Sequence, residues 1–231
     1  MIREHAFNTA WFGEPVGIVE LPFFDLPLAE RRAQLARFAW VEVGCDDPTT
    51  ALRLQLGETG FRFVDLQLNF RVGLREEARA SAGGLEVSFA SDVGFEVPLA
   101  DMPAFPTERF RHIPGMDDAR LTERYRGWAN ALVAEAPAHC LRVIHGGAVQ
   151  GWFLSRPSKP GLQLALAFSH RQATISGQTM YEASLGAYAA RGERLGWASF
   201  SASNTPVHNI YAHLGARFTA PTERYLWVRP A

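Results

Sequence analysis

The sequence predicts an α/β (α+β) fold with a mixed central sheet flanked by helices. Apolar runs of strand length alternate with amphipathic segments of helix length along the whole 231-residue chain. Polar caps, prolines and glycines stand between them, at positions typical of helix ends and tight turns. The content of 47% hydrophobic and 20% charged residues is that of an ordinary globular protein.

The N-terminal third contains strands and helices in alternation. Strands are expected at 15–21, 40–44 and 61–72, and helices at 28–38 and 46–60. The second helix is marked by an aspartate as N-cap, a proline near its first turn and a glycine near its end. The segment 61–72 alternates apolar and polar residues, which is the strand period. The glycine- and alanine-rich segment GLREEARASAGG that follows, at 73–84, is the best linker candidate.

The rest of the chain continues the alternation. After an expected strand FEVPLA (95–100) and an irregular stretch, a helix is expected at 118–135. The pair Gly146-Gly147 is a strong turn signal inside HCLRVIHGGAVQGWFLSR, which predicts a hairpin. The remaining expectations are a strand at 161–169, a helix at 178–192, a strand at 195–203, a helix from Asn204 to Gly215 and a final strand within 217–229.

Two segments repeat the same order of signals. WVEVGCDDPTTALRLQLGETGFRF (40–63) and WASFSASNTPVHNIYAHLGARF (197–218) both pass through a tryptophan-led strand, a polar cap, a proline, a helix and a glycine. Counted back from the closing glycine, Leu56 in the first copy corresponds to Tyr211 in the second. Since packing did not require a hydroxyl in the first copy, we expect a structural N-terminal half and a functional C-terminal half.

The segment FSHRQATISGQTMY (168–181) leads from a strand through a short loop into a helix that begins near Gly177. Main-chain N–H groups at a helix N-terminus bind anions, and the helix dipole favours phosphate there. The loop therefore suits a pyrophosphate, and an ordinary polar connection between strand and helix is the alternative. The side chains that would add hydroxyl groups or charge are Ser169, His170, Arg171, Thr174 and Ser176.

Two motifs resemble those of the GNAT acyltransferases, which use acyl-coenzyme A. The family signature Q/R-x-x-G-x-G/A falls on Gln172, Ile175 and Gly177, with isoleucine in place of the middle glycine. The helix motif N-x-x-A-x-x-x-Y-x-x-x-G-F is matched at its asparagine, tyrosine and glycine by Asn204, Tyr211 and Gly215. Weaker landmarks over nearly the whole chain resemble, in the same order, GNAT enzymes that acetylate nucleotide-linked amino sugars.

The resemblance implies a GNAT fold, with a truncated GNAT-like domain over 1–75 and a complete acyl-CoA-binding domain over 76–231. It implies that the pantetheine arm of acetyl-CoA lies between splayed strands and that an amine attacks the thioester directly. Tyr211, two helical turns beyond Asn204, would be the general acid that protonates the leaving sulfur, whereas core packing is its alternative role. The residues expected to contact acetyl-CoA are Phe168, Ser169, His170, Gln172, Ala173, Thr174, Ile175, Ser176, Gly177, Asn204 and His208.

The general base and the acceptor site are less defined. The strand 161–169 has no carboxylate, so His170, His208 and a water relay are all open as the base. Arg109, Arg111 and His112 lie on a proline-bounded loop and are expected to bind the acceptor, because the arginine fork pairs with phosphate oxygens. Solvated loop charges are the alternative for these three residues.

Composition limits the partners. A net charge of -1 with scattered arginines predicts no nucleic-acid binding, and no run reaches the ~18 apolar residues of a membrane span. No metal is expected, because histidines and cysteines lack metal-ligand spacing. Cys45 and Cys140 are expected to be reduced, buried thiols of a cytoplasmic protein.

The expected partners are a coenzyme A thioester and a small-molecule amine, and a homodimer is compatible with the resemblance. Two alternatives remain for the function. One is a GNAT acyltransferase with a different acceptor or acyl group, and the other is a non-catalytic GNAT-like binding protein.

Overall fold

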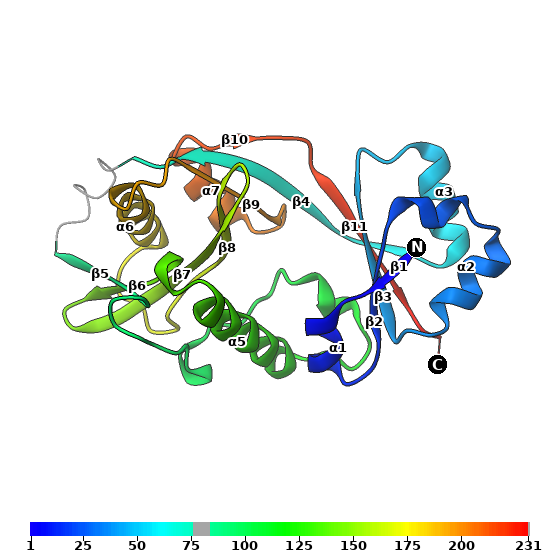
Figure 1. Ribbon diagram of the computed structural model, residues 1–231, viewed down its shortest axis with the longest axis horizontal. Helices are drawn as coiled ribbons and strands as arrows, with labels where there is room; N and C mark the ends of the chain where they lie inside the picture. The colour runs from blue at the N-terminus through cyan, green and yellow to red at the C-terminus, as the bar shows by residue number, and fades with distance from the viewer. Residues whose placement is uncertain (76–83, 231) are drawn as a thin grey trace.

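The computed structural model describes residues 1–75 and 84–230. Its strands are β1 (Ile2–Glu4), β2 (Val16–Val19), β3 (Trp40–Asp46), β4 (Arg62–Gly73), β5 (Leu85–Phe89), β6 (Cys140–His145), β7 (Ala148–Ser158), β8 (Gly161–Ser169), β9 (Leu195–Ser201), β10 (Arg217–Phe218) and β11 (Thr222–Val228). They form one eleven-stranded sheet in the order β1-β2-β3-β11-β4-β9-β8-β7-β6-β5, with β10 paired to β4 (Figure 1). Neighbouring strands are antiparallel except for the parallel pairs β2–β3 and β8–β9.

Helices flank this sheet. They are α1 (Ala6–Phe12), α2 (Leu28–Leu35), α3 (Thr50–Thr59), α5 (Asp118–Glu135), α6 (Gly177–Ala190) and α7 (Thr205–His213). Short 3-10 turns are η1 (Leu21–Asp25), η2 (Leu99–Asp101), η3 (Arg109–His112) and η4 (Pro137–His139). The predicted fold class, a mixed sheet with flanking helices, is confirmed.

The two ends of the chain are joined by an exchange of strands. β11, the last strand of the chain, lies between β3 and β4 and is antiparallel to both. β4 in turn pairs along most of its length with β9. Figure 1 shows β4 and β11 crossing between the two ends of the molecule in opposite directions. Each half of the sheet is therefore completed by a strand from the other half of the sequence.

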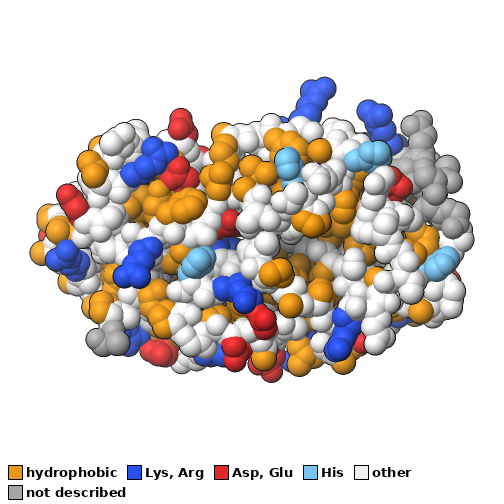
Figure 2. Space-filling model, turned by 180° about the vertical axis from the view of Figure 1, so that it is seen from behind, with side chains coloured by type: hydrophobic (Ala, Val, Ile, Leu, Met, Phe, Trp, Pro, Cys, Tyr) orange, Lys and Arg blue, Asp and Glu red, His pale blue; other side chains and the backbone are white. Residues whose placement is uncertain are grey.

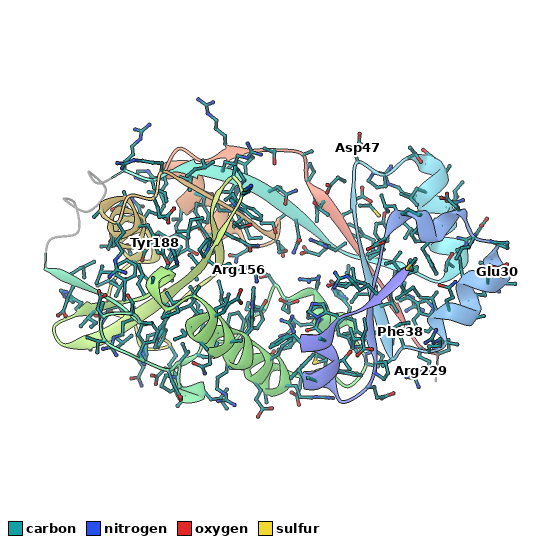
Figure 3. All side chains as sticks on the ribbon, in the orientation of Figure 1. Glu30, Phe38, Asp47, Arg156, Tyr188 and Arg229 are labelled. Atoms are coloured by element: carbon teal, nitrogen blue, oxygen red, sulfur yellow. The ribbon has the colours of Figure 1, made fainter. Side chains whose placement is uncertain are left out.

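Alternating side chains of the strands reach hydrophobic cores on both faces of the sheet. On β7, Phe153 packs with Tyr181 and Tyr188 of α6, whereas the next residues on either side pack with α5. The hydroxyl of Tyr188, labelled in Figure 3, donates to the carbonyl oxygens of His139 and Phe153 at 2.8 and 3.0 Å. These bonds satisfy a phenol that the core would otherwise leave unpaired.

Most predicted elements are present, and α5 and β8 match their expected bounds. The expected strand 95–100 is wrong, because Asn130 of α5 takes the main-chain groups of Val97 in place of a strand partner. Asn130 accepts from the N–H of Val97 at 2.8 Å and donates to its carbonyl oxygen at 3.2 Å. The strand lies instead at β5. The linker candidate 73–84 falls mainly on residues 76–83, which lie outside the described residues.

The start of α3 also differs from the prediction. Its N-cap is Thr49, whose hydroxyl accepts from the N–H of Leu52 at 3.2 Å, and not an aspartate. Asp47 has a φ of 50°, a left-handed conformation that a helix cannot include. Both cysteines are free and buried, as expected. Within the described residues, none of the helices has the length and apolar character needed to cross a membrane.

Candidate functional site

The central cleft of the molecule opens where β8 and β9 separate. The two strands pair only at Leu162 with Gly196 and at Gln163 with Trp197, and then diverge. Residues 164–167 of β8 and 198–201 of β9 line a cleft of about 400 Å³ between them. On this side β8 has no strand partner, so its main-chain polar groups face the cleft. An opening of this kind can receive an extended chain and offer it main-chain hydrogen bonds.

The helix α7 places Asn204 and Tyr211 on this cleft. Asn204 caps the helix, and its side chain accepts from the N–H of Val207 at 3.4 Å. Tyr211 lies two turns further on, and its ring is 3.9 Å from that of Phe70 and 5.2 Å from that of Tyr181. The side chain is only 3% exposed, yet it lines the cleft, and its hydroxyl has no hydrogen-bond partner among the described residues. Tyr211 thus packs in the core and also lines the cleft.

The electrostatics of Tyr211 follow from its surroundings. Burial raises the pKa of its phenol well above the usual value, and the neighbouring Tyr181 and Tyr188 add to the effect. The phenol is therefore neutral near pH 7 and carries a proton. It can donate this proton to a group in the cleft.

The loop between β8 and α6 has three free main-chain donors. Ser176 caps α6, since its hydroxyl accepts from the N–H of Thr179 at 3.1 Å. The N–H groups of Ser176, Gly177 and Gln178 have no acceptor among the described residues. Three consecutive free donors at the start of a helix form an anion-binding site.

The amides just before them are already used. Gln150 of β7 is only 3% exposed, and its side-chain oxygen accepts from the N–H groups of Thr174 and Ile175 at 2.7 and 3.3 Å. The N–H groups of Gln172 and Ala173 are bonded to His170, at 2.9 Å each. The sequence did not point to Gln150, because a glutamine in a hairpin strand carries no local signal for a distant loop.

Several residues predicted to contact the cofactor instead support the loop. The imidazole of His170 is held through both nitrogens, since Nδ1 accepts from Gln172 and Nε2 lies 3.4 Å from Asp101. Arg171 donates to a carbonyl oxygen at 3.1 Å. The side chain of Ile175 packs against the core beneath the loop, and the ring of Phe168 is buried against Trp152.

The remaining predicted residues are spread over the molecule. His208 lies on α7 with its ring 5.1 Å from that of Phe218, and it is not among the residues that line the central cleft. Arg111 forms an exposed ion pair with Asp118. His112 lines a second cleft, between α2, the end of α3 and the end of β11. Of the three predicted acceptor residues, the structure places only Arg109 at the central cleft.

Several charged side chains line the cleft or pair with residues that line it. Arg109 pairs with Glu42 of β3 at 3.0 Å and with Glu108 at 3.5 Å, and Tyr125 of α5 donates to Glu108. Burial opposes the charge of Arg109, but Glu42 and Glu108 outweigh it and raise its pKa. By contrast, Figure 2 shows charged side chains of both signs scattered over one face of the molecule.

Asp65 of β4 is a carboxylate at the cleft that sequence reasoning missed. It is 9% exposed and accepts from the hydroxyl of Ser201 at 2.6 Å. Burial raises its pKa, and the hydrogen bond from Ser201 works in the opposite direction. The alternation of segment 61–72 predicted a strand, but not which of its side chains meet the cleft. That depends on the place of β4 in the sheet, between β11 and β9, where Asp65 and Gln67 line the cleft.

Metal-ligating side chains do not cluster here. Across residues 1–75 and 84–230, no group of three or more His, Cys, Asp or Glu side chains is arranged to hold a metal ion. The cleft thus combines an open strand edge, a neutral phenol and a buried carboxylate, and its strand β8 leads through a loop to the free amides at the start of α6. This set of groups can bind a phosphate-bearing chain and transfer protons.

The fold is similar to that of solved GNAT structures. The chain resembles a GCN5-related N-acetyltransferase from Sphaerobacter thermophilus with a TM-score of 0.60 and 15% identity, over 100% of this chain and 76% of that one. It resembles a functionally unknown conserved protein from Staphylococcus epidermidis with a TM-score of 0.56 and 11% identity, over 94% and 85% of the two chains. A tandem GNAT protein from the clavulanic acid biosynthesis pathway gives 0.55 and 12% identity, over 95% and 77%.

No protein-family model and no curated protein sequence matches the chain. At the identities found among solved structures, the likeness establishes the GNAT fold.

Proposed function

We propose that this protein is an acyl-CoA-dependent N-acyltransferase that moves an acetyl group from acetyl-CoA to the amine of a small acceptor. The observation that carries the proposal is the cleft itself. In a GNAT fold, strands β8 and β9 diverge around an opening lined by Tyr211, and β8 leads to three amides at the start of α6. Neither these amides nor the hydroxyl of Tyr211 has a hydrogen-bond partner among the described residues.

The groups present fit acetyl-CoA. The amides of Ser176, Gly177 and Gln178 would hold the diphosphate, supported from behind by Gln150. The pantetheine arm, an amide-containing chain, would lie along the open edge of β8, and Asn204 at the opposite wall would add a polar contact. The other predicted contacts within 168–177, including His170, would act by shaping this loop.

The chemistry needs three groups of this chain. Bound acetyl-CoA supplies an acetyl group activated as a thioester. Main-chain N–H groups on the open edge of β8 would stabilise negative charge on the carbonyl oxygen when the amine nitrogen bonds to the acyl carbon. Tyr211 would donate its phenolic proton to the sulfur as the carbon–sulfur bond breaks, and would regain a proton from solvent.

Asp65 is the proposed acceptor of the proton that the amine loses. It lies at the cleft, whereas His170 is tied into its loop and His208 is not among the lining residues. Burial raises the pKa of the Asp65 carboxylate, which makes it a stronger base than an exposed carboxylate. The hydroxyl of Ser201, bonded to Asp65, would relay the proton when a direct contact is not made.

The finer identity of the acceptor rests on the sequence resemblance. The ordered landmarks resemble dTDP-fucosamine acetyltransferase, which favours a nucleotide-linked amino sugar as acceptor. The position of Arg109 at the cleft supports an acceptor there, although its charge is already paired with Glu42 and Glu108. A GNAT acyltransferase with another acceptor or acyl group remains the alternative.

The organisation proposed with this function is a truncated GNAT-like domain over 1–75 and a complete domain over 76–231. The matching β–α–β segments at β3–α3–β4 and β9–α7–β10, each with a glycine of positive φ after its helix, support a common origin of the two parts. Two free thiols fit the cytoplasm, where acetyl-CoA would be the donor.

The direct test is thiol release from acetyl-CoA by the purified protein, with a panel of amines that includes amino sugars and their nucleotide-linked forms. We expect saturable, amine-dependent release, and acetylated product by mass spectrometry. Binding of acetyl-CoA without release for any amine would favour the non-catalytic GNAT-like protein, and no binding at all would refute the proposal.

A further inference from the structure

Two opposite charges at the cleft face each other without forming an ion pair. Arg224 of β11 stands opposite Asp65 of β4 in the strand register, and both residues line the cleft. Figure 1 shows their two strands running side by side through the middle of the sheet. Directly opposed residues have Cβ atoms about 5 Å apart, close enough for a salt bridge. Among the described residues, however, neither side chain forms one.

Each of the two charges is turned to a neutral partner. Nε of Arg224 donates to the side-chain oxygen of Gln67 at 2.7 Å, and Asp65 accepts from Ser201 at 2.6 Å. The strand beneath Arg224 makes room for it, because a Cβ at Gly44 would lie 2.5 Å from its Nη1. These contacts fix the guanidinium by one edge and leave its two terminal nitrogens without a partner among residues 1–75 and 84–230.

The neighbouring carboxylates act on Arg224 from a distance, since none of them forms an ion pair with it among the described residues. Arg109 is paired with Glu42 and Glu108. Of the two arginines that line the cleft, Arg224 is therefore the one without an ion pair among the described residues. Burial lowers its pKa and the nearby Arg109 adds to the effect, whereas Glu42, Asp46 and Asp65 act in the opposite direction. An anionic ligand in the cleft would supply the hydrogen-bonded partner that the terminal nitrogens lack.

We propose that the terminal nitrogens of Arg224 bind an anionic group, carboxylate or phosphate, on the acceptor, and that Asp65 contacts its amine. The acceptor is then a small molecule with an amine and an acid group separated by only a few bonds. This inference rests on the proposed acyl transfer to an amine and adds the class of acceptor to it. The planar fork of arginine suits both kinds of oxyanion.

The first test needs no acceptor. The urea unfolding midpoints of the wild type, Arg224→Met and Arg71→Met are compared at constant ionic strength, in chloride and with added inorganic phosphate or acetate. Arg71 is an exposed residue of β4 away from the cleft and serves as the matched control. We expect phosphate or acetate to raise the midpoint of the wild type and the control more than that of Arg224→Met.

The free amides of Ser176–Gln178 are present in all three proteins, so anion binding there cancels in the comparison. Equal anion responses in all three proteins would overturn the role of Arg224. Comparison of the rise in unfolding midpoint with phosphate and with acetate shows which oxyanion the site prefers.

The second test uses matched acceptors with acetyl-CoA. An amino acid is paired with its amide, and glucosamine with glucosamine 6-phosphate. We expect kcat/KM to favour the acid-bearing member of at least one pair, and Arg224→Met to reduce that ratio about 10- to 100-fold, the usual effect of losing a hydrogen-bonded charge contact. Arg71→Met should leave the ratio unchanged.

The two failures are distinguishable. Acetylation of amines with no preference for the acid-bearing member, or with a ratio unaffected by Arg224→Met, would refute the inference and leave the transferase activity standing. Absence of acetylation for every amine would refute the proposed function. Since Arg224→Met could alter folding, Arg224→Lys is measured beside it, and partial recovery of the ratio is expected.

Discussion

Two buried tyrosines on neighbouring helices allow a controlled test of the proposed general acid. Tyr211 of α7 has a packed ring and a hydroxyl without a hydrogen bond among the described residues, whereas the hydroxyl of Tyr188 of α6 makes two. Replacing Tyr211 by Phe keeps the ring contact with Phe70 and removes only the hydroxyl. We therefore expect the unfolding free energy to change by less than about 1 kcal/mol.

The effect of Tyr211→Phe on the rate should be large. A positioned general acid contributes about 10²- to 10⁴-fold, so kcat should fall within that range. The affinity for acetyl-CoA should be largely kept, because the proposed diphosphate contacts lie on the loop at Ser176–Gln178 and not on α7.

Tyr188→Phe should show the opposite pattern. It removes a buried O–H whose single proton is shared between two carbonyl oxygens. The loss of this donor predicts a decrease of about 1–3 kcal/mol in stability and a Tm lower by about 2–12 °C for a chain of this size. Its kcat per folded molecule should equal that of the wild type, because Tyr188 does not line the cleft.

The assay is steady-state thiol release with saturating acetyl-CoA and the best amine of the panel, with the affinity for acetyl-CoA measured separately by calorimetry. A Tyr211→Phe protein with kcat within threefold of the wild type would refute the acid role. So would an equal loss of kcat in both variants, since that would indicate a general effect of disturbing the core.

Three further variants test the loop and the charge cluster. Gln150→Leu removes the acceptor for the amides of Thr174 and Ile175, so urea unfolding should show a loss of about 1–3 kcal/mol in stability. Calorimetry should show weaker binding of acetyl-CoA. Unchanged binding would contradict the role of the loop. As pH falls through the raised pKa of Asp65 its carboxylate is protonated, so kcat/KM should fall on the acid side, and Asp65→Asn should lower the rate and flatten that limb. Burial raises the pKa of Glu42, but Arg109 and Arg224 outweigh burial and hold this pKa below its usual value. The ionised Glu42 therefore stabilises the fold above its unfolded-state pKa, and this stabilisation is lost as pH falls through the folded-state pKa. Glu42→Gln should cost about 3–5 kcal/mol near pH 7 and remove this pH dependence of stability.

The parts of the fold that the sequence predicts well are those with local signals. The helix α5 begins after Asp117, whose side chain accepts from the N–H of Arg120 at 2.8 Å, and the hairpin turns at Gly146 and Gly147, both with positive φ. The repeated segments end alike, since Gly60 and Gly215 both have positive φ after their helices. Such caps and turns are encoded within a few residues.

The parts that the sequence did not predict depend on distant partners. The exchange of β4 and β11 joins segments more than 150 positions apart and places Asp65 and Arg224 at the cleft, which the alternation of β4 alone did not show. Gln150 supports a loop more than 20 residues away. The side chain of Asn130, on α5, accepts the hydrogen bond from the N–H of Val97 that a partner strand would otherwise accept. In each case the deciding hydrogen bond is long-range, and no local pattern contains it.

The helix α1 shows a local signal that is less usual. It begins after His5, whose Nδ1 accepts from the N–H of Asn8 at 3.3 Å, and ends at Gly13 with a φ of 85°. Histidine is outside the residues that commonly cap helices, so the start of α1 has no strong sequence signature.

The most direct test of the account is a titration of the isotope-labelled protein with coenzyme A, followed through its main-chain amide resonances. Binding of the diphosphate at the start of α6 predicts the largest shifts at Ser176, Gly177 and Gln178, with further shifts along the open edge of β8. The amides of Thr174 and Ile175, already bonded to Gln150, should move less. Resonances at the start of α6 that stay fixed while shifts appear elsewhere, or no shifts at all, would contradict the central claim.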